Sequence, residues 1–232
     1  MNDLDGYLDF AARNPEMFVN PEGAVFTILL DREAIRQAED VMEARLRAGG
    51  VSDEQARAWS RVGFVFQDQY LRIARDAVRF PDGSLGTYIR ILDDGNPTPG
   101  VIILPVYEGK VVLVNHFRHA TRRWHLEIPR GFGHPNATPE ESARAELAEE
   151  VGGDSTEMIS LGAFEPDAGA SIKRDELFFA ELRTYGMPDE HEAINEIRLV
   201  PVAEFEALLR NGVITDGFTL AAYARAKLRG LL

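Results

Sequence analysis

The feature that most constrains the fold is a helix whose two ends are both marked in the sequence. Thr138 and Glu141 form the pattern of a capping box, and Pro139 suits the first helical turn. Gly152 marks the end, because glycine readily adopts the left-handed conformation that closes a helix. We therefore predict a helix that begins after Thr138 and runs to Val151.

This helix carries two different stripes. Three apolar residues fall on a stripe that can face a core: Ala143, Leu147 and Val151. Three glutamates stand at positions i, i+3 and i+4 and share an adjoining face: Glu146, Glu149 and Glu150. Taken alone, such a glutamate pattern is usually a solvated helix face. Like charges so placed repel one another, however, and a bound divalent cation would relieve the repulsion.

Short apolar runs surround the helix and predict strands. The predicted strands are 101–106, 110–115, 125–128, 177–182 and 197–200, and two further helices are predicted at 202–209 and 219–228. Strands and helices mix without a regular βαβ repeat, so the class is α+β, or a mixed sheet between helices.

The chain before residue 95 has a different organisation. We predict helices from Asp31 to Ala48 and from Ser52 to Trp59, and a hairpin that joins Tyr70–Phe80 to Leu85–Leu92. The run 93–99 is a loop by composition and marks the boundary. We expect two domains, residues 1–95 and residues 96–232, with packing, dimerisation or a substrate lid as the role of the first.

Composition excludes several classes of function. The chain has no cysteine, which removes disulfides, thiolate nucleophiles and cysteine zinc sites. Its 38 acidic and 25 basic residues give a formal charge of -13, so long nucleic acid is not an expected partner. The N-terminus does not look like a signal peptide and the apolar runs are too short to cross a bilayer. We expect a cytoplasmic protein that binds no membrane.

The stretch from Gly131 to Gly152 resembles the signature of the Nudix family. Six residues are in register with it: Gly131, Glu146, Leu147, Glu149, Glu150 and Gly152. Ala137 and Ala145 stand where the signature has Glu and Arg, and Gly153 replaces an apolar residue. Arg144 is one residue before the position of the missing arginine. On a helix its side chain is rotated by roughly 100° from that of residue 145, so it is no automatic replacement.

The resemblance extends over about residues 62–230. The hairpin 101–119 looks like the one that precedes the signature in ADP-ribose pyrophosphatases, and the run 212–222 is similar to the C-terminal helix entry of that group. It implies the Nudix fold, a mixed sheet sandwiched between helices, with the N-terminal helices and hairpin as an attachment. It also implies hydrolysis of the diphosphate of a nucleoside-diphosphate sugar, with ADP-ribose giving AMP and ribose 5-phosphate as our first choice.

The resemblance also implies a metal site. Glu146 and Glu150 would bind Mg²⁺ directly, with Mn²⁺ as a substitute, and Glu149 would bind it directly or through water. The main-chain carbonyl of Arg130 is a further expected ligand. The expected catalytic residues are Glu146 and a general base on the later acidic loop, for which we choose Glu192 over Glu190.

Substrate contacts are expected from a third set of residues. The resemblance places Gly131 in the substrate site, Arg118 against a phosphate or the terminal sugar, and Glu127 either on the substrate or bracing the loop. Further arginines and aromatic residues are open candidates for phosphate contact and base stacking: Arg122, Arg123, Arg174, Phe66, Tyr70 and Phe164. A homodimer is expected from the subgroup.

Three alternatives stay open. The first is a Nudix-like module that binds a nucleotide sugar as a sensor, which Ala137 and Ala145 favour and the retained glutamates oppose. The second is an enzyme for another substrate, such as GDP-mannose or a dinucleoside polyphosphate; mRNA decapping fits the acidic charge poorly. The third is a structural protein with an acidic helix.

Overall fold

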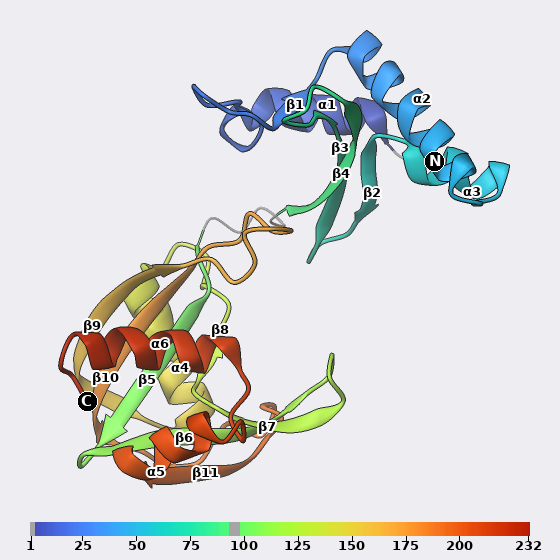
Figure 1. Ribbon diagram of the computed structural model, residues 1–232. Helices are drawn as coiled ribbons and strands as arrows, with labels where there is room; N and C mark the ends of the chain where they lie inside the picture. Colours follow the sequence, from blue (N-terminus) through green and yellow to red (C-terminus); the bar gives the residue numbers. More distant parts are fainter. Residues whose placement is uncertain (1–2, 93–97) are drawn as a thin grey trace. The chain divides into compact units, whose positions relative to one another are not determined.

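A computed structural model describes residues 3–92 and 98–232 of the chain (Figure 1). The chain forms two compact units, one of Met1–Gly95 with Asp167–Lys173 and one of Asn96–Pro166 with Arg174–Leu232. The border expected between residues 95 and 96 lies outside the described residues. Within the described ranges, no helix combines the length and the apolar character needed to cross a membrane.

The first unit packs helices against a small antiparallel sheet. Its elements are α1 (Leu4–Arg13), a 3-10 helix (Pro15–Met17), β1 (Thr27–Leu29), α2 (Arg32–Ala48), α3 (Asp53–Ser60), β2 (Gly63–Gln67), β3 (Arg72–Arg79) and β4 (Leu85–Leu92). The hairpin expected from the sequence is confirmed, because β3 pairs with β4 along its whole length. The expected helices α2 and α3 are also confirmed, with the side chains of Asp31 and Ser52 as their N-caps.

A buried polar network lies at the centre of this unit. Asp76 is 1% exposed and forms an ion pair with Arg90 on the neighbouring strand. It also accepts a hydrogen bond of 2.6 Å from the hydroxyl of Tyr7, which belongs to α1. The Tyr7 ring packs edge to face against Phe18 and Phe64. Because a buried charge is costly unless it is paired, this network fixes α1 against the sheet.

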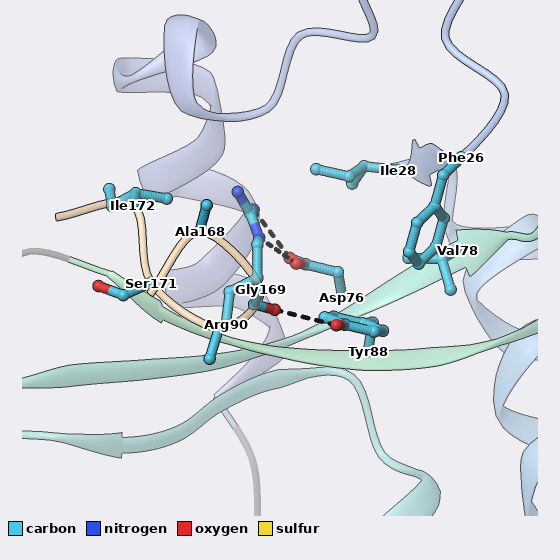
Figure 2. A pocket seen from close by; sticks show the side chains of 11 residues that line it. Phe26, Ile28, Asp76, Val78, Tyr88, Arg90, Ala168, Gly169, Ser171 and Ile172 are labelled. Atoms are coloured by element: carbon cyan, nitrogen blue, oxygen red, sulfur yellow. Dashed lines mark hydrogen bonds and ion pairs between the residues drawn. The ribbon is translucent and has the colours of Figure 1, made fainter. Parts of the chain in front are cut away.

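The segment Asp167–Lys173 comes from far along the chain and completes the first unit. The amide of Ile91 donates to the carbonyl of Ala170 at 2.7 Å, and the amide of Ile172 donates to the carbonyl of Ile91 at 3.2 Å. A cavity of about 330 Å³ lies between this segment and β4 (Figure 2). Asp76 and Arg90 line the cavity and bind each other, so its charged groups have partners within the unit.

The second unit is built on a mixed sheet. Its strands are β5 (Val101–Tyr107), β6 (Lys110–Arg118), β7 (Arg123–Glu127), β8 (Arg130–Gly131), β9 (Asp154–Phe164), β10 (Asp175–Thr184) and β11 (Ile194–Pro201). The order is β11-β6-β5-β10-β9, with β7 beside β6 and β8 beside β5. β5 and β10 run parallel, while the other pairs are antiparallel.

Helices cover both faces of this sheet (Figure 1). They are α4 (Pro139–Val151), α5 (Val202–Arg210) and α6 (Gly217–Leu228). Val101 and Ile103 of β5 pack in one core with Leu147 of α4, whereas Ile102 and Leu104 pack in another with α5 and α6. Successive residues of a strand point to opposite faces, so a strand with apolar residues throughout must be buried on both. The expected α+β fold, a mixed sheet between helices, is confirmed.

Most elements of the second unit follow the sequence pattern, with one clear exception. The capping box of α4 is present, and Gly152 closes the helix in the left-handed conformation, as expected. β9 was not predicted, because its polar residues alternate irregularly and only some of them are buried. The sheet supplies its partner: β9 pairs with β10 over its whole length.

Candidate active site

The site begins where β8 lies against the second half of α4. Glu146 projects from α4 onto the main chain of Gly131, and it is largely buried. A Cβ atom on residue 131 would lie 2.0 Å from Oε1 of Glu146. Only glycine can therefore accept this approach. Gly131, which we expected in the substrate site, makes room for the first carboxylate of the cluster.

Glu150 lies one turn further along the same face. Its side chain is only about 3% exposed, and its Oε2 accepts a 3.0 Å hydrogen bond from the amide of Arg130. This bond holds the main chain of Arg130 beside the glutamates, which is where the expected carbonyl ligand belongs. The helix and the short strand are thereby joined through the carboxyl group of Glu150.

The carboxylates lie in an environment that disfavours their charge. Burial, followed by the charges of Glu149 and Glu192, raises the pKa of Glu146 to about 7. Burial also raises the pKa of Glu150 to about 8, against the opposing hydrogen bond from Arg130. A divalent cation would relieve this strain, because its charge favours the ionised form of each ligand. The residues present therefore fit a divalent metal ion bound through carboxylate oxygens.

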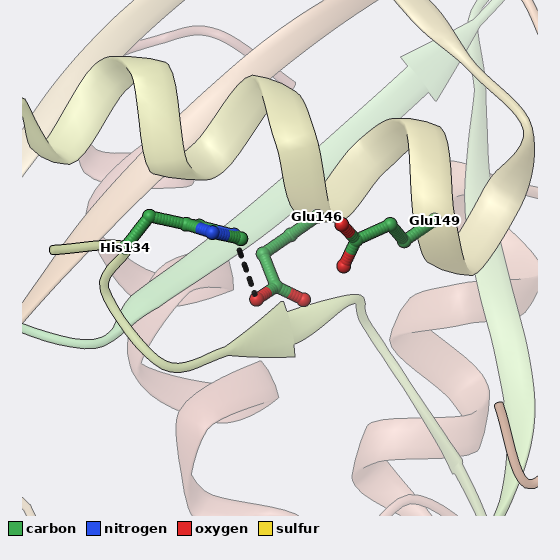
Figure 3. Close-up of side chains that lie close together, drawn as sticks. All are labelled: His134, Glu146 and Glu149. Carbon is green, nitrogen blue, oxygen red and sulfur yellow. Dashed lines mark ion pairs between the residues drawn. The ribbon is translucent and has the colours of Figure 1, made fainter. Parts of the chain in front are cut away.

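His134 is a neighbour of the cluster that the sequence did not reveal. Its Nε2 atom lies 3.9 Å from Oε1 of Glu146. One donor atom each from His134, Glu146 and Glu149 lie within 4.8 Å of one another (Figure 3). A single histidine in a loop rich in glycine and proline has no sequence context that marks it as a ligand. Only the folding of the loop against α4 brings it here.

A second group of charges surrounds Glu127 at the end of β7. Glu127 is 1% exposed and accepts a 2.6 Å hydrogen bond from Nε of Arg118. Nε of Arg130 lies 3.9 Å from the same oxygen. Glu127 thus lies between two arginines, and both roles expected for it stay predictions.

His116 connects this group to the glutamates of α4. Its Nδ1 lies 3.6 Å from Oε1 of Glu150 and 4.0 Å from Oε1 of Glu127. Burial, followed by the charges of Arg118 and Arg130, lowers its pKa to about 4. The ring is therefore neutral near pH 7, and it lies between Glu127 and Glu150.

The acidic loop before β11 is fixed at both ends near the site. The amide of Asp189 donates to the carbonyl of Glu149 at 2.8 Å, and the amide of Phe117 donates to the carbonyl of Ala193 at 2.8 Å. Glu192 lies between these anchors, and its charge helps to raise the pKa of the two buried glutamates. Glu190 is exposed and is not among the charges that shift these pKa values. Of the two candidate bases, Glu192 is the one whose charge acts on the cluster, and its role as the base stays a prediction.

The departures from the Nudix signature have visible consequences. Arg144 does not replace the missing arginine at Ala145, as expected, because its guanidinium binds elsewhere. Nη1 of Arg144 donates to Oγ of Ser155 at 2.7 Å, and Nη2 donates to Glu140 at 2.8 Å. Glu146 is therefore held by burial and by the glycine contact rather than by an arginine on its own helix.

Other expected contacts are spread over the surface or the core. Arg122, Arg123 and Arg174 are exposed. Phe66 and Tyr70 are exposed residues of the first unit, whereas Phe164 packs edge to face on Phe218 in the second. Asp216 was missed by the sequence reasoning. It caps α6 through the amide of Thr219, and its Oδ1 lies 3.8 Å from Nη2 of Arg130.

Comparison with known proteins identifies the family. A model of the NUDIX domain matches residues 96–219, which is more than half of the chain. The chain therefore belongs to the Nudix family and is a Nudix pyrophosphohydrolase.

Within the family it resembles ADP-ribose pyrophosphatases. It is 27% identical to the ADP-ribose pyrophosphatase of Bacillus subtilis (strain 168) over 141 residues, which cover 60% of this chain and 73% of the relative. A solved structure, "Crystal structure of ADP compounds hydrolase", matches with a TM-score of 0.63 and 21% identity. This match covers 74% of the present chain and 93% of the solved one, and at this identity it supports the fold alone.

Proposed function

We propose that the chain hydrolyses the diphosphate linkage of a nucleoside-diphosphate sugar in a Mg²⁺-dependent reaction, with ADP-ribose as the first-choice substrate. The products would be AMP and ribose 5-phosphate. The observation that carries the proposal is the glutamate cluster of α4, packed on the glycine of β8 with two pKa values raised by burial. The similarity to a named ADP-ribose pyrophosphatase supports the choice of substrate.

Three glutamates and one carbonyl would hold the cation. Glu146 and Glu150 would bind it directly, Glu149 directly or through water, and the Arg130 carbonyl would be a further ligand. Mn²⁺ would be a substitute. When bound, the cation would neutralise negative charge on the diphosphate oxygens and lower the pKa of a bound water molecule. Burial keeps the carboxylates fixed, so little reorganisation is needed when the substrate arrives.

Glu192 is the proposed general base. Water attacks one phosphorus, the bond to the bridging oxygen breaks, and the carboxylate of Glu192 takes the proton released by the water. The loop that carries it is anchored to Glu149 and to Phe117 through main-chain hydrogen bonds. These two anchors fix the main chain on both sides of Glu192 relative to α4 and β6, which supports its choice as the proton acceptor.

Arg118 is the proposed contact for a phosphate or the terminal sugar. Glu127 holds the guanidinium through Nε, so the orientation of Arg118 is set before the substrate binds. Gly131 would line the same site, because it packs directly against the carboxylate of Glu146 and leaves it room. The substrate would thus lie between the glutamates of α4 and the arginine at the end of β6.

The first test is release of AMP from ADP-ribose with and without Mg²⁺, beside GDP-mannose and a dinucleoside polyphosphate. We expect Mg²⁺-dependent AMP, with ADP-ribose the best of the panel. Glu150→Gln should lose most of the turnover while it stays folded, with a circular dichroism spectrum like that of the wild type. Full activity in Glu150→Gln would contradict the metal assignment. A better rate on another member of the panel would change the substrate and keep the reaction.

A second candidate is a sensor module that binds a nucleotide sugar without turnover. Ala145 favours it, because Arg144 binds Ser155 and Glu140 instead of supporting Glu146. Calorimetry with ADP-ribose separates the two functions. Binding with no Mg²⁺-dependent AMP would favour the sensor, whereas turnover excludes it.

The first unit is proposed as a region for homodimer formation and for covering the substrate. It carries several exposed large apolar side chains: Trp59, Val65, Phe66, Tyr70 and Ile89. Exposed apolar residues that gather on one unit often mark an interface. Light scattering at working concentration tests this proposal, and a monomer would contradict it.

A further inference from the structure

His134 has a buried ring nitrogen that lacks a partner. Its Nε2 is inaccessible to solvent and forms no hydrogen bond. Oε1 of Glu146 lies 3.9 Å from it, which is too long for a hydrogen bond. The side chain as a whole is 41% exposed, so this one atom is enclosed while the rest of the ring reaches solvent. Because enclosed polar atoms are nearly always satisfied, an unpaired nitrogen beside two carboxylates fits a ligand shared with them.

The loop holds this ring in place from its main chain. The amide of His134 donates to Oγ of Ser142, a fully buried residue of α4, at 3.0 Å. The carbonyl of His134 accepts from the amide of Ala137 at 3.2 Å. Both main-chain polar groups of His134 are therefore hydrogen-bonded, so the backbone position from which its side chain projects toward Glu146 is fixed.

The donor atoms are spaced for one metal ion. An ion with bonds of about 2.1 Å can span two donors up to about 4.2 Å apart. The distance of 3.9 Å between His134 and Glu146 falls within that limit. The three donor atoms, with the one from Glu149, lie within 4.8 Å of one another. Neighbouring ligands of an octahedral ion with such bonds lie about 3.0 Å apart, so side-chain movements of about 1–2 Å bring all three to one ion.

We propose that His134 is a nitrogen ligand of the metal ion, beside Glu146 and Glu149. The site then prefers ions that accept imidazole, such as Mn²⁺ or a heavier first-row divalent ion, over Mg²⁺, which prefers oxygen. This inference rests on the proposed function, because the same glutamates hold the cation there. It adds a ligand outside the glutamate helix and a specificity that the glutamates alone would not give.

The test uses Mn²⁺ alone, with no nucleotide, on the full chain. Titration followed by electron paramagnetic resonance gives the dissociation constant, and pulsed measurements detect the coupling of a directly bound ¹⁴N nucleus. We compare the wild type with His134→Gln and with His119→Gln, a matched loss of an exposed histidine. We expect ¹⁴N coupling in the wild type and in His119→Gln, and its loss in His134→Gln. Mn²⁺ affinity should fall about tenfold in His134→Gln, and Mg²⁺ affinity, measured by competition, about twofold or less.

The outcomes separate this proposal from the proposed function. Tight Mn²⁺ binding that Glu146→Gln weakens, with no ¹⁴N coupling in the wild type, would overturn the role of His134 and keep the glutamate site. An equal loss of Mn²⁺ and Mg²⁺ affinity in His134→Gln would also overturn it, since a structural role affects both ions. Absence of Mn²⁺ binding to the wild type would overturn both proposals.

Discussion

Replacing Gly131 with alanine tests whether the position of Glu146 controls the reaction. The new Cβ would lie 2.0 Å from Oε1 of Glu146, whereas ordinary contact begins at 3.4 Å, so the carboxylate must move by about 1.4 Å (3.4 − 2.0). Gly131 is not among the residues with positive φ, so alanine fits the backbone. The atom that must yield is the end of a flexible side chain, and we therefore expect the fold to survive.

The expected effect is on kcat rather than on stability. Misplacement of a reacting or positioning group by about 1 Å can cost roughly 100-fold in rate, which corresponds to about 2.7 kcal/mol. We expect at least that loss in Mg²⁺-dependent AMP release from ADP-ribose, with a melting temperature within about 4 °C of the wild type.

Gly217→Ala is the matched control for this substitution. Its Cβ would have no atom within 4 Å, and Gly217 is also free of positive φ. Its rate should stay within about twofold of the wild type, since nothing moves. A Gly131→Ala protein that turns over at nearly the wild-type rate would refute the reasoning, because it would show that Glu146 need not occupy its observed position.

Three further predictions follow from the same contacts. Glu192→Gln should lower kcat on ADP-ribose by about 100-fold or more with little change in KM, because it removes the proposed proton acceptor; a normal kcat in the variant would rule Glu192 out. Folding raises the pKa of Glu146 to about 7 and of Glu150 to about 8, so the folded state holds more protons. The free energy of unfolding of the metal-free protein should therefore fall as pH rises from about 5 to 8, and Glu150→Gln or saturating Mg²⁺ should reduce that slope in denaturant titrations; a slope unchanged by either would contradict the shifts. Asp76→Ala should cost about 3–5 kcal/mol in the same titrations, because Arg90 loses its buried partner; a cost under 1 kcal/mol would show that the pair is replaceable.

Local patterns were enough to predict the helix that carries the site. The capping box, the closing glycine and the spacing of the three glutamates act within a few residues, and α4 forms as those patterns indicate. β5 was predicted from an uninterrupted apolar run, which suits a strand buried on both faces. β9 has no such run, and its existence depends on hydrogen bonds from β10.

The first unit shows the same division. α2 and α3 have polar caps that the sequence displays, and both were predicted. α1 was not predicted, and it is fixed by the contact of Tyr7 with Asp76, which is 69 residues away along the chain. The inclusion of Asp167–Lys173 in this unit is likewise a long-range pairing with Ile91 that no local pattern reveals.

By itself, the sequence determined the family, the α+β class and the glutamate face of one helix, because helix periodicity and capping are local properties. Tertiary structure alone decided which residues meet that face. It brought His134 to Glu146, paired Glu127 with Arg118, and placed the charge of Glu192 near enough to act on Glu146. The physical reason is that these contacts join different loops, strands and helices, and no local periodic pattern indicates which of them will meet. Their distances are fixed only when the sheet and the helices have packed.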